Sequence, residues 1–143
     1  MRSRIGTRVT CVGTIGEDMK KTLCVDFDGV IHSYKSKWVD AHTILDEPVP
    51  GAFAWLEAML DSEDFEVCIY SSRSREPGAC AAMIAWFEKH GFTRANELAW
   101  PTQKPAAYLT IDDRAFRFEG DFPSEAWLLR FRPWNAAARG GRE

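Results

Sequence analysis

Short apolar runs alternate along the chain with segments in which apolar residues recur every three or four positions. The runs at residues 22–25 and 65–70 are rich in β-branched and aromatic side chains, which predicts two buried strands. The spacing of apolar residues predicts a helix of about ten residues after Gly51 and a second helix over residues 77–90. Gly91 is placed to cap the end of the second helix.

Four weaker patterns fill the rest of the chain. Residues 96–99 and 107–111 are interpreted as a third and a fourth strand, and residues 116–123 and 126–131 each fit a short edge strand. Strands that alternate with helices indicate a parallel sheet covered by helices on both faces. We therefore predict an α/β fold.

The composition fits one globular domain. The chain has 143 residues, of which 45% are hydrophobic and 27% are charged, enough for one core and too few for two. No apolar run approaches the roughly 18 residues of a membrane span, and no secretory signal precedes the first strand. The four cysteines form no C-x-x-C pair, so neither a disulfide framework nor a zinc site is indicated. We expect a cytoplasmic protein that does not enter the membrane.

Charge is distributed unevenly around the net value of −3. Residues 21–129 carry 10 basic and 18 acidic residues, whereas residues 130–143 carry four basic and one acidic residue. Basic ends can contact nucleic acid, but solvated ends are the commoner case. We predict a flexible N-terminal extension (1–20), a folded domain (21–129) and a basic C-terminal tail (130–143). Met19, directly before the first strand, is interpreted as the natural start.

Polar side chains gather where the predicted strands end, and the carboxyl ends of parallel strands meet at one edge of a sheet, where ligands bind. The residues brought together in this way are Asp26 and Asp28, Ser71 and Ser72, Asp112 and Asp113, with Lys104 shortly before the last strand. Side chains two positions apart on an extended segment point the same way, so Asp26 and Asp28 face the site together. Gly29 then permits a sharp exit of the chain.

Carboxylates crowded at one edge repel each other by several kcal/mol at intermediate dielectric, which predicts a bound cation. Mg²⁺ is favoured, since it takes a few carboxylate oxygens and keeps room for water and a phosphate. No cluster of histidines or cysteines indicates a softer metal. Lys104 can neutralise a phosphate oxygen. The residues therefore predict a site for Mg²⁺ and a phosphate group.

Three segments of the chain resemble, in their order along the sequence, the motifs of a known superfamily. "DFDGV" after the first strand, "IYSSR" after the second and "KPAAYLTIDDR" around the fourth resemble motifs I to IV of the haloacid dehalogenase superfamily of phosphohydrolases. The resemblance covers roughly residues 21–120 and implies a three-layer, Rossmann-like fold with a central parallel sheet. It implies that Asp26 is the nucleophile that forms an aspartyl-phosphate, and that Asp28 is the general acid and then the base.

The same resemblance implies roles in phosphate and metal binding. The implied phosphate-binding residues are Ser71, with Ser72 as a substitute, and Lys104. The implied Mg²⁺ ligands are Asp26, the main-chain carbonyl of Asp28, Asp112, and Asp113 as a further ligand or support. Dehalogenases of the superfamily lack the second aspartate and ATPase pumps carry threonine there, so Asp28 implies phosphomonoester hydrolysis or phosphoryl transfer.

Many members of the superfamily insert a cap domain, for which this chain has no room. Asp28 and Ser71 are separated by 42 residues, and Ser71 and Lys104 by 32, and the two predicted helices occupy these gaps. We expect a capless member with an open site. Candidates to cover the substrate are His32, Tyr34, Lys35, Lys37 and Trp38. Candidates to bind a second anionic group are Arg73 and Arg114, although ion pairs within the fold are the commoner role for both.

The leading hypothesis is a Mg²⁺-dependent phosphatase whose substrate is a nucleotide, a sugar phosphate or a nucleic-acid end. Phosphoryl transfer to an acceptor other than water is a second enzymatic hypothesis. A module that binds Mg²⁺ and phosphate for regulation, without turnover, is the alternative from another class. The sequence predicts neither the oligomeric state nor the individual substrate.

Overall fold

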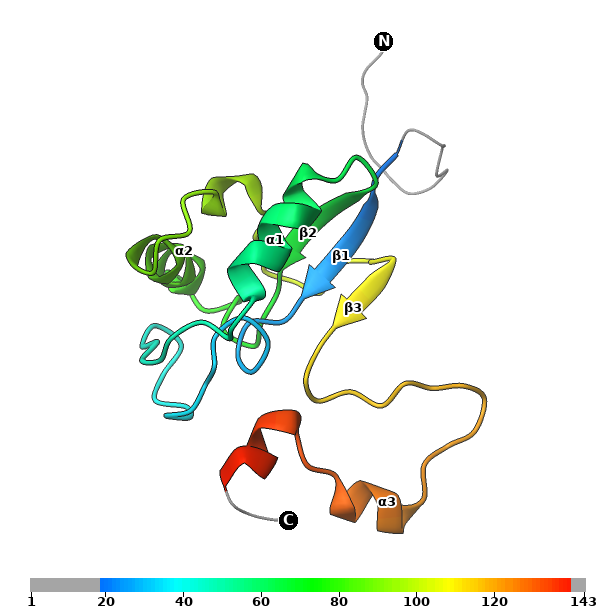
Figure 1. The fold of residues 1–143 in the computed structure, drawn as a ribbon. Helices are drawn as coiled ribbons and strands as arrows, with labels where there is room; N and C mark the ends of the chain where they lie inside the picture. The colour runs from blue at the N-terminus through cyan, green and yellow to red at the C-terminus, as the bar shows by residue number, and fades with distance from the viewer. Residues whose placement is uncertain (1–18, 140–143) are drawn as a thin grey trace.

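The computed structural model describes residues 19–139, so nearly all of the predicted N-terminal extension lies outside the described residues. Three strands, β1 (Lys21–Val25), β2 (Phe65–Ile69) and β3 (Leu109–Ile111), form a parallel sheet in the order β2-β1-β3 (Figure 1). Helix α1 (Ala52–Asp61) connects β1 to β2, and helix α2 (Ala79–Lys89) follows β2. The predicted α/β class, parallel sheet and two helices are confirmed.

The core lies on one face of the sheet. Along β1, Leu23 and Val25 point to this face, and the alternation continues to Phe27 beyond the strand. Their partners in register on β2 are Val67 and Ile69. The helices complete the cluster with buried apolar side chains, namely Leu56 from α1 and Met83, Trp86 and Phe87 from α2. Burying this apolar surface is what holds the helices against the sheet.

The predicted third strand is reduced to a single β-bridge. Residues Ala95–Glu97 form a 3-10 helix (η2), and only Ala99 pairs with β2, opposite Cys68. The indole N–H of Trp100 donates to the carbonyl of Ala95, which holds the turn closed. The connection from there to β3 contains no helix.

The two predicted edge strands are wrong. Residues 126–131 fall mainly in helix α3 (Glu125–Arg130), because the hydroxyl of Ser124 accepts from the backbone N–H of Trp127 and caps the helix. A short apolar run does not by itself distinguish a strand from a helix. Residues 116–123 form bends without a strand, and Phe118 and Phe122 are exposed.

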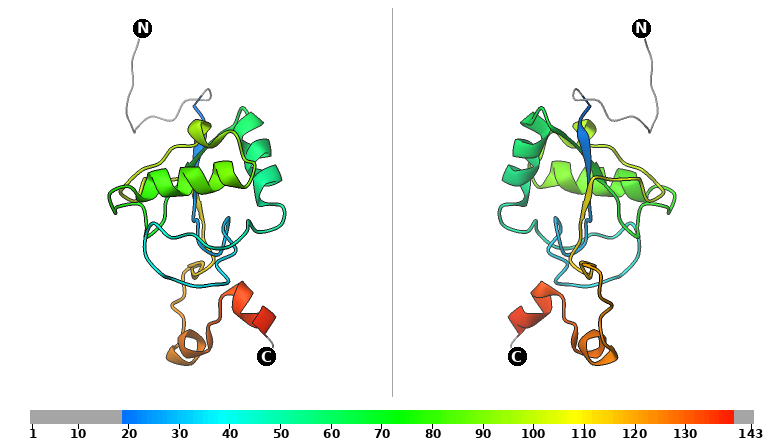
Figure 2. Two further views of the ribbon diagram at one scale, coloured as in Figure 1. Left: turned by 90° about the vertical axis from the view of Figure 1, so that its left-hand side faces the viewer. Right: turned by 90° about the vertical axis from the view of Figure 1, so that its right-hand side faces the viewer.

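The C-terminal part of the chain lies beyond the carboxyl ends of the strands (Figures 1 and 2). Its last described element is a 3-10 helix, η3 (Trp134–Arg139). The predicted basic tail is therefore ordered where the structure describes it, and it contacts the loop after β1. No helix among residues 19–139 is long and apolar enough to cross a membrane.

Candidate functional site

A tight turn directly after β1 begins the site. The carbonyl of Phe27 accepts from the backbone N–H groups of Ile31 and His32, each at 2.9 Å. Gly29 lies within this turn at φ +85°, a conformation that favours glycine. A Cβ atom at Gly29 would collide with the carboxylate of Asp113. The glycine therefore lets the turn approach the end of β3 closely.

Three carboxylates converge at the ends of the two neighbouring strands β1 and β3. Each of Asp26, Asp112 and Asp113 offers an oxygen that lies within 4.8 Å of those of the other two. The backbone supports this convergence, since the N–H of Asp26 donates to the carbonyl of Ile111 at 2.9 Å. The three carboxylates expected to bind Mg²⁺ therefore meet, and the carboxylate of Asp28 is not among them. A role for the main-chain carbonyl of Asp28 as a further ligand stays a prediction.

Burial and the neighbouring charge of Asp112 raise the pKa of Asp26 to about 8. Burial also raises the pKa of Asp113, whose carboxyl group hydrogen-bonds that of Asp26. Because the pKa of Asp26 is raised to about 8, the crowded cluster retains a proton at neutral pH. A divalent cation would replace that proton. Three oxygen donors with room for further ligands fit Mg²⁺, a hard ion that prefers oxygen.

Asp26 and Asp28 line one cavity of about 160 Å³. The loop after β1 contributes Tyr34, Lys37 and Trp38 to its walls. These three are among the residues predicted to cover the substrate. Lys35, from the same prediction, points elsewhere and forms an exposed ion pair with Glu47.

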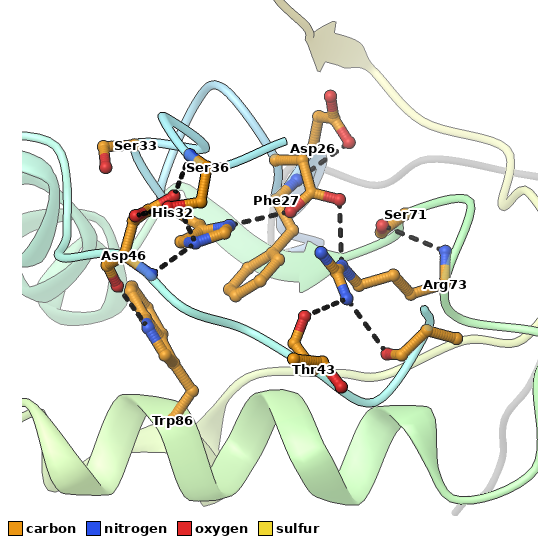
Figure 3. A network of polar contacts seen from close by, with 12 residues as sticks. Asp26, Phe27, His32, Ser33, Ser36, Thr43, Asp46, Ser71, Arg73 and Trp86 are labelled. Carbon is orange, nitrogen blue, oxygen red and sulfur yellow. Dashed lines mark hydrogen bonds and ion pairs between the residues drawn. The ribbon is translucent and has the colours of Figure 1, made fainter. Parts of the chain in front are cut away.

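Two donors hold the carboxylate of Asp28 in place. Its Oδ1 lies 2.8 Å from Nδ1 of His32, and its Oδ2 accepts from Nε of Arg73 at 2.9 Å. The backbone N–H of Asp46 donates to Nε2 of His32 at 3.1 Å, so the neutral ring carries its proton on Nδ1 and donates it to Asp28. Figure 3 shows this network around His32, Asp46 and Arg73.

Arg73 is buried completely and joins the loop after β2 to the loop after β1. Its Nη1 donates to the backbone carbonyls of Asp40, Ala41 and Thr43 at 2.8 to 3.2 Å. The ring of Trp38 stacks on its guanidinium, whose carbon lies 4.8 Å from the ring centroid. Arg73 is therefore the internal ion-pair partner that the sequence analysis favoured.

Burial shows that two of the predicted substrate contacts are wrong. Arg73 is fully buried, and His32 is only 1% exposed with both ring nitrogens engaged. Neither side chain has a surface left for a substrate. Arg114, the third candidate, does line the cavity.

The two serines after β2 have different positions. Ser72 lines the cavity, whereas Ser71 is buried beneath it and its hydroxyl accepts from the backbone N–H of Arg73 at 3.1 Å. The backbone N–H of Ser71 donates to the hydroxyl of Ser74, which closes the turn. Ser72 is thus the better placed serine, and Ser71 mainly shapes the turn that presents it.

Lys104 does not line the cavity. It borders a separate surface depression together with Tyr70, Arg75 and Thr102. Its charge acts on the thiol of Cys24, two residues before Asp26, where it opposes the rise in pKa that burial causes. Among residues 19–139, Lys104 forms no ion pair with the acidic cluster.

Sequence reasoning missed the part of the site that comes from the C-terminal segment. Pro133 and Asn135 line the cavity, and the indole N–H of Trp134 donates to the carbonyl of Gly29 at 2.7 Å. The side-chain amide of Asn135 donates to the carbonyl of Ser33 at 3.3 Å. More than one hundred positions separate these partners, and no local pattern in the sequence indicates that they meet.

No protein-family model matches this chain, and no curated protein matches it. The arrangement of its residues therefore carries the functional argument.

Proposed function

We propose that this protein is a Mg²⁺-dependent phosphomonoester hydrolase of the capless haloacid dehalogenase type, with the three-layer fold of that superfamily. The observation that carries the proposal is the position of Asp26. It belongs both to the carboxylate cluster suited to Mg²⁺ and to the cavity that also contains Asp28. A nucleophile, a metal site and a proton carrier are what hydrolysis of a phosphomonoester requires.

Asp26 has one oxygen suited to attack. Its Oδ1 accepts from the backbone N–H of Phe27 at 2.8 Å, which orients the carboxylate. The other oxygen forms the bond to phosphorus as the bond from phosphorus to the leaving oxygen breaks. The leaving oxygen takes a proton from Asp28. Mg²⁺ held by Asp26, Asp112 and Asp113 would neutralise the negative charge on the phosphoryl group and on the nucleophile.

Hydrolysis of the aspartyl-phosphate restores the enzyme. Asp28 takes a proton from water as the water oxygen bonds to phosphorus and the bond to Asp26 breaks. Inorganic phosphate leaves, and Asp28 holds the proton that it gives in the next turnover. Arg73 and His32 position Asp28 for both steps, because each binds one of its oxygens.

The test is hydrolysis of a panel of phosphomonoesters by the full chain, with Mg²⁺ or with EDTA. We expect release of phosphate that depends on Mg²⁺. Asp26→Asn should lower kcat on the order of a thousand-fold or more, as loss of a nucleophile does, and Asp28→Asn should also lower it strongly. The matched control is Asp121→Asn, an exposed aspartate outside the cavity, which should retain full activity.

Hydrolysis that survives EDTA and both active-site substitutions would contradict the proposal. Transfer of phosphate to added alcohols in preference to water would indicate a phosphotransferase instead.

A second candidate function, a module that binds Mg²⁺ and phosphate without turnover, is favoured by one observation. Both oxygens of Asp28 accept from donors of the protein. Binding of both ligands by calorimetry without any phosphate release would support that module.

A further inference from the structure

The cavity is small for an active site that is expected to be open. Its volume of about 160 Å³ is roughly half of the ~300 Å³ at which pockets for drug-sized ligands begin. Such a space accommodates a phosphoryl group and a few further heavy atoms. A nucleobase attached to the phosphate would extend beyond it.

The C-terminal segment makes the cavity small. Residues 133–135 return to the site from beyond α3, and Pro133 and Asn135 form one wall. Two hydrogen bonds hold this wall to the loop after β1, from Trp134 to the carbonyl of Gly29 and from Asn135 to the carbonyl of Ser33. Gly29 directly follows Asp28, so the wall is attached beside the catalytic aspartates. The wall therefore borders the same cavity as Asp26, the space that a phosphate would enter.

Two basic side chains line the same cavity. Lys37 comes from the loop after β1 and Arg114 follows the acidic pair at the end of β3. Within residues 19–139, neither side chain lies within ion-pair distance of a carboxylate. Lys37 instead lies over the ring of Tyr34, and Arg114 over that of Phe131. Unpaired cations beside a phosphate site suit a ligand with a second negative charge.

We propose that the substrate of this site is a small phosphomonoester with a second anionic group, which Lys37 and Arg114 bind while residues 133–135 exclude larger substrates. This inference rests on the proposed phosphatase function. It narrows the three substrate classes that the sequence left open, since it disfavours nucleic-acid ends and nucleotides. The C-terminal segment would then limit the size of the substrate, as a cap domain does in larger enzymes.

The experiment compares three substrates with the full chain and Mg²⁺. Glycerol phosphate and phosphoglycerate, each esterified at a terminal carbon, differ only by a hydroxymethyl group against a carboxylate. The third substrate is a short oligonucleotide with a terminal phosphate. We expect kcat/KM for phosphoglycerate to exceed that for glycerol phosphate by about ten-fold, the effect of one charge-assisted hydrogen bond. The oligonucleotide should react slowest.

Matched substitutions separate the roles of the side chains. Lys37→Met and Arg114→Met should each lower kcat/KM for phosphoglycerate more than kcat/KM for glycerol phosphate, and so reduce the preference for phosphoglycerate. Their controls are Lys35→Met and Arg117→Met, exposed residues outside the cavity, which should keep the preference.

Trp134→Phe removes the hydrogen bond to Gly29 and should raise hydrolysis of the oligonucleotide relative to glycerol phosphate. Trp127→Phe is its control.

Equal loss of activity on both small esters in Lys37→Met and Arg114→Met would show that these cations bind the reacting phosphoryl group, which overturns the inference. An oligonucleotide that reacts as fast as the small esters also overturns it. Absence of hydrolysis of all three substrates contradicts the proposed function instead. Calorimetric binding of the two small esters then decides the inference, because phosphoglycerate must bind more tightly than glycerol phosphate, and equal affinities would refute it.

Discussion

Asp26 combines two demands that oppose each other in the metal-free protein. As the proposed nucleophile it must be ionised, yet burial and the nearby charge of Asp112 raise the pKa of this carboxyl group to about 8. The proton that Asp26 retains relieves the repulsion between the carboxylates. Binding of a divalent cation would supply the same relief while leaving Asp26 ionised. The proposed metal would therefore also ionise the proposed nucleophile.

The stability of the metal-free protein should fall as the pH rises from about 4 to about 8. In this range Asp26 keeps its proton in the folded state, because its pKa is about 8, and loses it in the unfolded state, where the pKa has its ordinary value of 3.8. Unfolding then releases a proton, so the free energy of unfolding decreases with pH. Urea unfolding in EDTA across this range measures the effect.

Asp26→Asn should flatten this pH dependence, and saturating Mg²⁺ should oppose the loss of stability in the wild type. A wild-type stability that rises steadily from pH 4 to pH 8 in EDTA would contradict the assignment of a retained proton to Asp26. Asp121→Asn serves again as the control and should follow the wild type.

Gly29 is required by the turn after β1 and also by the close approach of Asp113. Its positive φ of +85° marks a turn, but a positive φ also occurs at Gly51, with +87°, where no atom would obstruct a Cβ. At Gly29 a Cβ would meet the carboxylate of Asp113. The residue therefore serves both the turn and the carboxylate cluster.

Gly29→Ala should weaken Mg²⁺ binding, whereas Gly51→Ala should not. Both substitutions place alanine at a positive φ, which costs about 1–2 kcal/mol of stability through backbone strain. Only the first also displaces Asp113, so the loss of metal affinity is specific to it. Calorimetric titration with MgCl₂ measures the affinity, and thermal unfolding measures the shared strain. Equal Mg²⁺ affinities in the two variants would show that the contact with Asp113 is unimportant.

The elements cooperate through two loops at the carboxyl edge of the sheet. The turn after β2 presents Ser72 to the cavity and sends Arg73 inward to the loop after β1. That loop has no regular secondary structure of its own over most of its length. The charged guanidinium of Arg73 therefore holds this loop in place through four hydrogen bonds, one to Asp28 and three to backbone carbonyls.

Arg73→Met should destabilise the protein by about 3–5 kcal/mol, because it removes a buried guanidinium on which Asp28 and three backbone carbonyls depend for hydrogen bonds. The side chain of Asp28 is only 13% exposed, so water cannot readily replace the lost donor. Arg94→Met is the matched control, since Arg94 forms ion pairs with the exposed Asp61 and Glu97 and should lose much less. Denaturant unfolding compares the two variants. Equal losses would mean that Arg73 contributes no more than a surface ion pair.

Secondary structure could be predicted where the pattern was long and had clear ends. Helix α2 was expected over residues 77–90 and forms over Ala79–Lys89, followed by Gly91 at φ +93° as a C-terminal cap. The short apolar run at 126–131 has no such length, and the cap at Ser124 decided in favour of a helix. Local hydrogen bonds at an element's end thus decided what apolar spacing left open.

At the scale of the whole molecule, the chain divides into a well-packed part and a lightly packed part. β1 is paired on both sides and its last three residues are buried. Helix α3 has no buried residue, and Leu128 and Leu129 are exposed. The two hydrogen bonds from Trp134 and Asn135 nevertheless connect the lightly packed part to the loop after β1.

Hydrogen exchange should reveal this division. Amides of β1, β2 and α2 should be the slowest to exchange, because opening them requires exposure of the core, whereas amides of α3 should exchange close to the rate of an unfolded peptide. Exchange measured by mass spectrometry tests this. Protection of α3 equal to that of α2 would mean that a further surface covers it.

The indole N–H of Trp134, observed by NMR, should be protected relative to that of Trp127, for which no hydrogen bond is found in the described residues.

The sequence alone determined the α/β class and the convergence of Asp26, Asp112 and Asp113. The reason is that parallel strands bring their carboxyl ends to one edge whatever the length of the connections. Only the tertiary structure decided that His32 and Arg73 are internal supports, that Ser72 rather than Ser71 faces the cavity, and that Lys104 lies outside it. The direction of a loop side chain depends on distant partners, and such partners also bring the C-terminal segment to Gly29.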